Sequence, residues 1–305
     1  MPKCQVLLSA YNGLEYFPEQ IDSLLNQTYN DIEIFIRDDG STDKSFSEYL
    51  HNINEQNICV EFGENKGTIK SFFSLLEKSN PDAEYFAFCD QDDYWLADKV
   101  SNAIELLKKN EDIPVLYCSD AFLVDKNLNS IGKKFMTNDP NFNLRSLLIF
   151  NSSLGCTCVF NKKLRDIILS NLPNYNNVIM HDWWCALVAS CTGKIIYDNR
   201  PGILYRQHGK NQIGADSKSN LKRTKKIVTG KKNTNTLPQI FEFCKFYKKY
   251  FNETSKYNSF FENNNSMFNR FKYSCKFKFN SLKKTILFRL LFTFNYYKLS
   301  NLGDY

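Results

Sequence analysis

The chain has 305 residues, a net charge of +6 and a hydrophobic content of 43% that includes 26 Phe and 17 Tyr. This is ample for a packed core, and the length accommodates one large domain with an appendage or two modest domains. The ten cysteines form no Cys-x-x-Cys pair and lie mostly in apolar runs, which favours a reducing cytosol over a disulfide framework and argues against a zinc site. No charged segment followed by an apolar one opens the chain, so we expect no signal peptide.

The first part of the chain alternates between short apolar runs and segments with helical spacing. The apolar runs predict strands at 5–10, 32–36, 59–62 and 85–89, and the periodicity predicts helices near 17–28, 67–76 and 96–107. Strands that alternate with helices of about 10–15 residues are typical of an α/β fold with a doubly wound, mainly parallel sheet.

Polar clusters follow three of these strands. They are Tyr-Asn-Gly at 11–13, Asp-Asp-Gly-Ser at 38–41 and Asp-Gln-Asp-Asp at 90–93. In doubly wound sheets ligands bind beyond the carboxyl ends of the strands, and right-handed crossovers place these three ends on one rim. The sequence therefore predicts a ligand site at this edge.

The third cluster indicates what kind of site this is. Asp90, Asp92 and Asp93 are three acids within four residues, directly after a buried strand. Carboxylates this close repel each other, and burying them is costly without a cation. A divalent metal such as Mg²⁺ or Mn²⁺ prefers carboxylate oxygens. A solvated acidic turn that caps the next helix is the alternative, and the convergence of three clusters favours the metal.

The second part of the chain, after Asn110, is mixed. Strands are predicted at 115–119, 122–124, 155–160, 194–197 and 203–206, with a helix over 161–170. A further helix is predicted to begin at His181-Asp182 and to continue into a buried apolar run.

Together these segments resemble a family 2 glycosyltransferase, which transfers a sugar from a nucleotide-sugar donor on a GT-A fold. Seven segments in the family's order carry the resemblance: VLLSAYNG (6–13), IRDDGSTD (36–43), ENKG (64–67), FCDQDDYW (88–95), GCT (155–157), HDWW (181–184) and YRQHG (205–209). They span nearly all of residues 1–217. The spelling of 88–95 and 181–184 is most similar to bacterial rhamnosyltransferase-like members of polysaccharide synthesis.

The resemblance implies a nucleotide-sugar site joined to a metal site. Asp90 and Asp92 match the DxD motif, whose carboxylates bind the Mg²⁺ or Mn²⁺ that bridges the diphosphate. His208 is expected as a third metal ligand or a diphosphate contact, and Asp93 as a further metal or donor-sugar contact. The implied nucleotide-sugar contacts are Ser9, Tyr11, Asn12, Asp38, Asp39, Lys66, Gly67, Asp90, Gln91 and Arg206.

Some of these residues have simpler alternatives. Asp38 and Asp39 are suited to accept hydrogen bonds from a base N–H or a ribose hydroxyl, but Asp39-Gly40 also suits a plain turn. Arg206 is expected to pair with a phosphate or to be a surface cation.

The transfer also needs a base for the acceptor hydroxyl. The resemblance assigns this role to Asp182, whose alternative role is to complement the helix macrodipole. The family commonly has Glu-Asp here, whereas this chain has His181-Asp182, so we expect His181 to orient the base or to replace it in part. Trp183 and Trp184 are expected to stack on an acceptor sugar, with one of them in the core.

The charge divides the chain near Ser217. Residues 218–305 contain 19 Lys and Arg against 4 Asp and Glu, a net +15, whereas residues 1–217 carry −9. We expect a glycosyltransferase domain over 1–217, with a nucleotide-binding half (1–110) and an acceptor and catalytic half (111–217). Residues 218–305 are expected to form a basic, aromatic helical tail.

The tail is expected to contact the anionic inner face of the plasma membrane peripherally, because cations alternate with aromatic residues. Its longest uncharged apolar-rich run, 290–297, is far shorter than the roughly 20 residues of a spanning helix. An oligomerisation arm is the alternative, and a nucleic-acid surface is not expected because no binding motif is present.

The sequence thus predicts a cytoplasmic, metal-dependent, inverting glycosyltransferase. It would use Mn²⁺ or Mg²⁺ to move a sugar such as rhamnose onto a lipid-linked or oligosaccharide acceptor in surface or capsular polysaccharide synthesis. A sugar nucleotidyltransferase is one alternative, but residues 9–13 poorly match the Gly-rich phosphate loop that it needs. The other is a non-catalytic carbohydrate- or lipid-binding protein on the same fold, and the intact Asp90, Asp92 and Asp182 argue against it.

Overall fold

A computed structural model describes residues 2–136, 140–148, 150–208 and 237–247, together with Cys275, Ile286 and Arg289. The chain forms two compact units, one of residues 1–140 and 152–215 and one of residues 141–151 and 216–305. Most of the predicted tail over 218–305, including the run at 290–297, lies outside the described residues.

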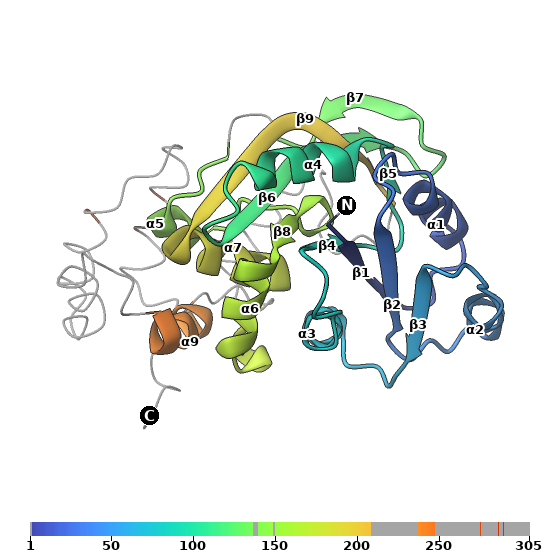
Figure 1. The fold of residues 1–305 in the computed structure, drawn as a ribbon, viewed down its shortest axis with the longest axis horizontal. Helices are drawn as coiled ribbons and strands as arrows, with labels where there is room; N and C mark the ends of the chain where they lie inside the picture. The colour runs from blue at the N-terminus through green and yellow to red at the C-terminus, as the bar shows by residue number, and fades with distance from the viewer. Residues whose placement is uncertain are drawn as a thin grey trace. The chain divides into compact units, whose positions relative to one another are not determined.

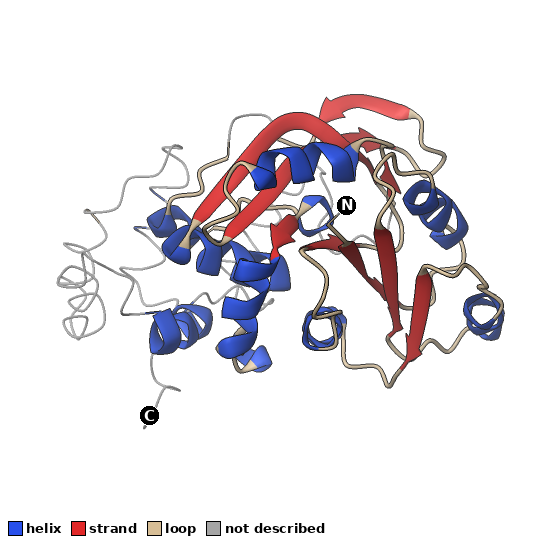
Figure 2. Cartoon of the chain, viewed as in Figure 1, coloured by secondary structure: helices blue, strands red, loops and turns tan. Residues whose placement is uncertain are grey.

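The first unit is built on one mixed sheet (Figures 1 and 2). The strand order is β3-β2-β1-β4-β8-β6-β9-β5, with β7 paired to β6. Parallel pairing joins β1 to β2 and β4, β2 to β3, and β6 to β9, and it accounts for most of the paired positions. The strands are β1 Cys4–Ala10, β2 Ile32–Asp38, β3 Ile58–Phe62, β4 Tyr85–Cys89, β5 Tyr94–Trp95, β6 Val115–Val124, β7 Ser130–Lys134, β8 Val159–Asn161 and β9 Lys194–Arg206.

Helices cover the first four strands on both faces, because the order of the crossovers reverses after β3. The helices α1 and α2 lie on one side of β1–β3, and α3 lies on the other (Figure 1). The helices of this unit are α1 Phe17–Leu25, α2 Lys44–His51, α3 Thr68–Glu77, α4 Lys99–Lys108, α6 Lys162–Ser170 and α7 His181–Thr192, with 3₁₀ turns η1 Gly155–Thr157 and η2 Tyr175–Asn177.

The core follows from the apolar spacing of these elements. Every residue of β4 is buried, as expected for a strand that is covered on both faces. On α1, Phe17, Ile21 and Leu24 form one buried face that packs in the same cluster as Val6 and Leu8 of β1. Similar spacing buries one face of α3 and one face of α4.

The structure differs from the sequence-based expectation in the second part of this unit. The strand β6 continues through Asp120, and β9 is likewise unbroken, where two strands each were predicted. The pairing of β6 with β9 shifts register around Asp120, whose carboxylate accepts hydrogen bonds from the backbone N–H groups of Ala121 and Met136 at 2.8 and 3.0 Å. The buried acid is thereby satisfied inside a continuous strand.

Other differences arise from short or polar elements. The helix α2 buries only Phe46 and Leu50, so it has little apolar periodicity to detect. The segment at 155–160, predicted as one strand, begins with the turn η1 before β8. The strands β5 and β7 were not predicted either, since their residues become strands only by pairing with β9 and β6.

In the described part of the second unit, the regular elements are α5 Leu144–Leu147 and α9 Leu237–Tyr247. The buried residues of α9 include Ile240, Phe243 and Tyr247, which share one face at helical spacing. None of the helices within the described residues has the length and hydropathy of a membrane span.

The arrangement of β1, β2 and β4 confirms the predicted rim. These three strands are parallel neighbours, so their carboxyl ends meet at one edge of the sheet. The three polar clusters of the sequence follow those ends.

Candidate active site

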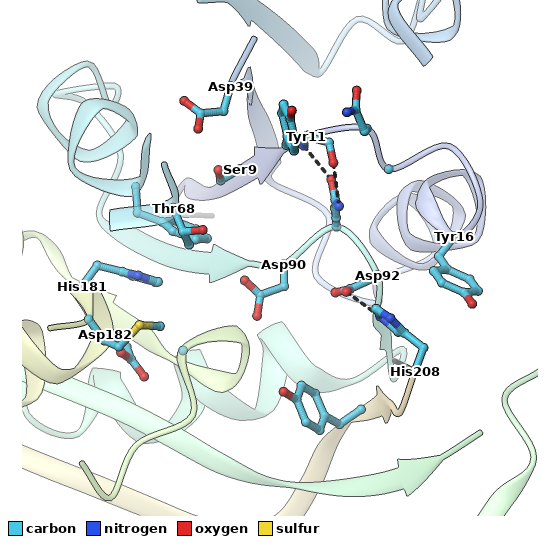
Figure 3. Close-up of a pocket in the computed structure, with 18 of the residues that line it drawn as sticks. Ser9, Tyr11, Tyr16, Asp39, Thr68, Asp90, Asp92, His181, Asp182 and His208 are labelled. Atoms are coloured by element: carbon cyan, nitrogen blue, oxygen red, sulfur yellow. Dashed lines mark hydrogen bonds and ion pairs between the residues drawn. The ribbon is translucent and has the colours of Figure 1, made fainter. Parts of the chain in front are cut away.

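A cavity of about 490 Å³ lies at this edge, entirely within the first unit (Figure 3). Its walls come from the loops after β1 and β4, the start of α7 and the residues that follow β9. Ten of the predicted site residues line it, and these are Ser9, Tyr11, Asn12, Asp39, Asp90, Gln91, Asp92, His181, Asp182 and His208. Seven do not, and these are Asp38, Lys66, Gly67, Asp93, Trp183, Trp184 and Arg206.

The loop after β1 is held by side-chain to backbone hydrogen bonds. Asn12 has a positive φ of 47°, and its side-chain oxygen accepts from the N–H groups of Thr42 and Asp43 at 2.9 and 3.0 Å. The side-chain amide of Gln91 accepts from the N–H of Tyr11 at 2.7 Å and donates to its carbonyl at 3.1 Å. Two amide side chains thus tie the β1 loop to the β2 loop and to the acidic turn after β4.

The two acids at the end of β2, Asp38 and Asp39, are also hydrogen-bonded within the protein. Asp38 accepts hydrogen bonds from the N–H and the hydroxyl of Ser41. Asp39 accepts from the N–H groups of Lys66 and Gly67 at 2.9 and 2.8 Å and forms a buried ion pair with Arg37. Lys66 and Gly67 therefore contact Asp39 through their backbone N–H groups. A nucleotide contact by Asp38 or Asp39 stays a prediction.

The acids after β4 are differently placed. Asp90 and Asp92 are partly exposed and face the cavity, whereas Asp93 is fully buried. Burial raises the pKa of Asp90 to about 7, with further contributions from the charges of Asp92 and Asp182. Burial, with further contributions from the charges of Asp92 and Asp90, raises the pKa of Asp93 well above its usual range. Burial and mutual repulsion thus make it costly to ionise these carboxylates together, and a bound cation would relieve that cost.

These residues fit a divalent cation. Ligand atoms of Asp90, Asp93 and Cys156 lie within 4.8 Å of one another, and the Oδ2 atom of Asp93 is buried with no hydrogen-bond partner in the described part of the chain. Burial also raises the pKa of the Cys156 thiol well above its usual range, so this sulfur stays protonated and is a poor ligand for a hard cation. Asp90 and Asp92, which face the cavity, are the residues suited to hold Mg²⁺ or Mn²⁺, and Asp93 lies buried next to Asp90.

His208 and Arg206 are brought to this turn by the end of β9. The Nε2 atom of His208 lies 2.8 Å from Oδ2 of Asp92, so two of the three predicted metal ligands are adjacent. Arg206 is 1% exposed, and it bonds the carbonyl of Asp92 at 2.9 Å and the carboxylate of Glu19. The alternative of a surface cation is wrong for Arg206, because its guanidinium is buried where it braces the acidic turn against α1.

Sequence reasoning missed Glu19 and Tyr16, the two residues of the α1 region in this network. The guanidinium of Arg206 lies 4.5 Å from the centre of the Tyr16 ring, which also packs 5.1 Å from the ring of His208. Neither residue belongs to a motif, and an acid in the first turn of a helix is common. Their contacts with Arg206 and His208, which lie about 190 positions away in the sequence, appear only in the folded structure.

The helix α7 begins at the opposite wall. Asp182 is 2% exposed, lines the cavity, and its Oδ1 accepts from the N–H of Trp183 at 2.7 Å. Trp183 and Trp184 are both buried, whereas only one of them was expected in the core. Neither indole lines the cavity, so stacking on an acceptor sugar within it has no support in this geometry.

His181 is also buried, and it stacks on Phe72 with ring centres 3.8 Å apart. Burial lowers the pKa of its imidazole to about 3, so the ring is neutral at physiological pH. So weak a base is poorly suited to replace Asp182. Its ring nitrogens have no hydrogen-bond partner within the described residues, so it does not orient the Asp182 carboxylate by a hydrogen bond.

Comparison with known proteins bears on the identity of this site. Residues 5–169, more than half of the chain, match the family described as Glycosyl transferase family 2. The chain is 31% identical over 230 residues to a protein of Shigella flexneri named dTDP-rhamnosyl transferase RfbG, covering 68% of this chain and 74% of that one. It is 28% identical over 160 residues to an Escherichia coli protein named UDP-Glc:alpha-D-GlcNAc-diphosphoundecaprenol beta-1,3-glucosyltransferase WfaP, covering 52% of this chain and 60% of that one.

Solved structures support the same conclusion about the fold. The crystal structure of S. aureus TarS 1–349 in complex with UDP-GlcNAc matches with a TM-score of 0.54 at 15% identity, over 96% of this chain and 81% of that one. The complex of the same protein with UDP matches with a TM-score of 0.53 at 16% identity, over 97% and 81%. The fold is that of a GT-A glycosyltransferase, as the sequence predicted. The chain belongs to glycosyl transferase family 2, and it is a glycosyltransferase.

Proposed function

We propose that this chain moves a sugar from a nucleoside diphosphate sugar onto an acceptor hydroxyl, with inversion at the anomeric carbon and with Mg²⁺ or Mn²⁺. One observation carries the proposal: a single cavity is lined by Asp90 and Asp92 at the end of β4 and by Asp182 at the start of α7. A carboxylate pair suited to a cation thus shares a cavity with a separate carboxylate suited to act as a base.

Each carboxylate has a distinct task in this scheme. Asp90 and Asp92 would hold the cation, which would neutralise charge on the departing nucleoside diphosphate. Asp182 takes the proton of the acceptor hydroxyl as that oxygen bonds to the anomeric carbon and the bond to the diphosphate oxygen breaks. Direct displacement with a single base places the new bond opposite the old one, which inverts the configuration.

The relatives support the choice of substrates. Their names specify dTDP-rhamnose-type and UDP-glucose-type donors and, in one case, a diphosphoundecaprenol-linked acceptor. We therefore infer a nucleotide-sugar donor, with rhamnose a leading candidate for the sugar, and a lipid-linked or oligosaccharide acceptor of surface polysaccharide synthesis. Membership of the family argues against a nucleotidyltransferase and a non-catalytic binding protein.

A binding screen tests this proposal directly. The full chain is titrated by calorimetry with dTDP-rhamnose, UDP-Glc and UDP-GlcNAc, each with and without Mn²⁺ or Mg²⁺. We expect at least one donor to bind, and to bind more tightly with the cation. Failure of all three donors to bind under either condition contradicts the proposal.

The basic tail is proposed to place the enzyme at an anionic membrane, where a lipid-linked acceptor would be found. The support is the net charge of +15 over residues 218–305, interleaved with Phe and Tyr. The full chain should float with vesicles that contain phosphatidylglycerol, and it should be released as salt rises because screening weakens surface attraction. Equal recovery with neutral phosphatidylcholine vesicles contradicts an electrostatic contact, and failure to float with either vesicle favours the oligomerisation arm.

A further inference from the structure

One polar side chain of the cavity is left unsatisfied by the protein. His181 is 3% exposed, and both of its ring nitrogens are buried without a hydrogen-bond partner in the described part of the chain. Buried polar groups are nearly always paired, and leaving one unpaired destabilises the folded state. Such a group inside a ligand cavity therefore points to a partner supplied by a ligand.

The ring is held so that it has little freedom to find another partner. It stacks on Phe72 with ring centres 3.8 Å apart and planes inclined by 17°, and the edge of Phe88 packs against it at 4.7 Å. Gly155 also lines the cavity, and a Cβ atom there would lie only 3.3 Å from Nε2 of His181. A side chain at Gly155 would therefore crowd this nitrogen, and Figure 3 shows the ring pointing from α7 into the cavity.

The chemistry of the ring defines what it can recognise. Because burial lowers the pKa of His181 to about 3, the imidazole is neutral and offers one N–H donor and one acceptor nitrogen. A phosphate would be better matched by a cation, whereas a hydroxyl both donates and accepts. Three of the acids that line the same cavity, Asp90, Asp92 and Asp182, are already proposed to hold a cation and to act as the base.

We propose that His181 binds a sugar hydroxyl in the cavity and so determines which sugar is accepted. The inference rests on the proposed function, because it needs a sugar in this cavity. A site that hydrogen-bonds a substrate hydroxyl rejects an analogue that lacks it, since its own polar atoms are then left unpaired. The hydroxyl belongs either to the donor sugar or to the acceptor sugar, and the experiment separates the two.

The test compares His181→Phe with a matched control, Lys99→Met, in the full chain. Phe preserves an aromatic ring for the stack and removes both nitrogens. Lys99 is the control because its amine is also buried without a hydrogen-bond partner among the described residues, but it lies over the Trp95 ring and does not line the cavity. Both variants should unfold at a higher temperature than the wild type, and only His181→Phe should alter sugar recognition.

The readout is the affinity for a nucleotide sugar against that for its nucleoside diphosphate. The donor is whichever of dTDP-rhamnose, UDP-Glc or UDP-GlcNAc the wild type binds, with Mn²⁺ present. If the donor hydroxyl is the partner, His181→Phe weakens donor binding by about 10-fold or more and leaves nucleoside diphosphate binding unchanged. If the acceptor hydroxyl is the partner, donor binding is unchanged and the KM for the acceptor rises by a similar factor.

A second variant guards against a packing effect of the larger apolar ring. His181→Gln retains a donor and an acceptor, so it should recover part of the lost sugar recognition. The inference is overturned if His181→Phe leaves both donor affinity and acceptor KM unchanged, or if it weakens nucleoside diphosphate binding equally. Absence of donor binding by the wild type is a different result, because it contradicts the proposed function itself.

Discussion

The two sides of the cavity treat their polar side chains in opposite ways. On the side of β1 and β2, Asn12 and Asp39 are each bonded to backbone groups of a neighbouring loop. On the side of β4 and α7, buried polar atoms of Asp93 and His181 have no partner within the described residues. The first side uses polar side chains to build its loops, whereas the second leaves some buried polar atoms unpaired by the described residues.

Buried polar atoms that stay unpaired lower the stability of the folded state. A typical hydrogen bond contributes about 1 kcal/mol to stability, whereas an unpaired buried group costs about 1–3 kcal/mol. Natural active sites retain such strained or repelling groups at the expense of stability. Substitutions on the two sides should therefore separate loss of stability from loss of activity.

The largest expected effect is on the α7 side. Asp182→Asn preserves the size of the side chain but removes its basicity, so transfer should fall by roughly 10²–10⁴-fold while donor and cation bind about as before. The measurement is steady-state transfer beside calorimetric donor binding. Near-normal transfer by this variant would place the base elsewhere in the cavity.

The β2 side should lose stability instead. Arg37→Met leaves the buried Asp39 carboxylate without its ion pair, and the free energy of unfolding in urea should fall by about 3–5 kcal/mol. Lys109→Met is the control, because it breaks an exposed pair with Glu105 and should change stability by less than about 1 kcal/mol. Similar losses for the two variants would refute a structural role of the buried pair.

Lys99 is a buried polar group that does not line the cavity, so it should affect stability alone. Burial lowers the pKa of Lys99 from its ordinary 10.5 to about 8, so below pH 8 the folded state contains a penalised ammonium. The unfolded chain binds more protons between about pH 8 and 10.5, so this lysine makes stability rise with pH over that window. Lys99→Met should remove this slope and should stabilise the protein by roughly 3 kcal/mol at pH 7.

The smallest effect in this series concerns the acids of the β4 turn. Asp92→Asn should reduce cation-dependent binding of UDP or dTDP by at least about 10-fold, because a ligand of the cation is lost. It should not unfold the protein, since it relieves repulsion among the acids. Asp112→Asn, an exposed acid away from the cavity, should bind as the wild type does. Unchanged binding by Asp92→Asn would remove Asp92 from the cation site.

Much of the fold could be predicted because local patterns record it. The apolar runs before Tyr11, Asp39 and Asp90 mark the strands β1, β2 and β4, and the topology rules bring their ends together. The short elements α2, β5 and β7 escaped prediction, because their structure depends on pairing and packing rather than on periodicity.

By itself, the sequence determined the ends of β1, β2 and β4, the order of the motifs and the presence of Asp90 and Asp92 at one rim. The tertiary structure decided which polar groups are satisfied and which are not. It buried Arg206 against Asp93, 113 positions away, and against Glu19, 187 positions away, and it enclosed His181 between Phe72 and Phe88. Burial, protonation and hydrogen bonding arise from contacts between distant segments, so no local pattern of residues contains them.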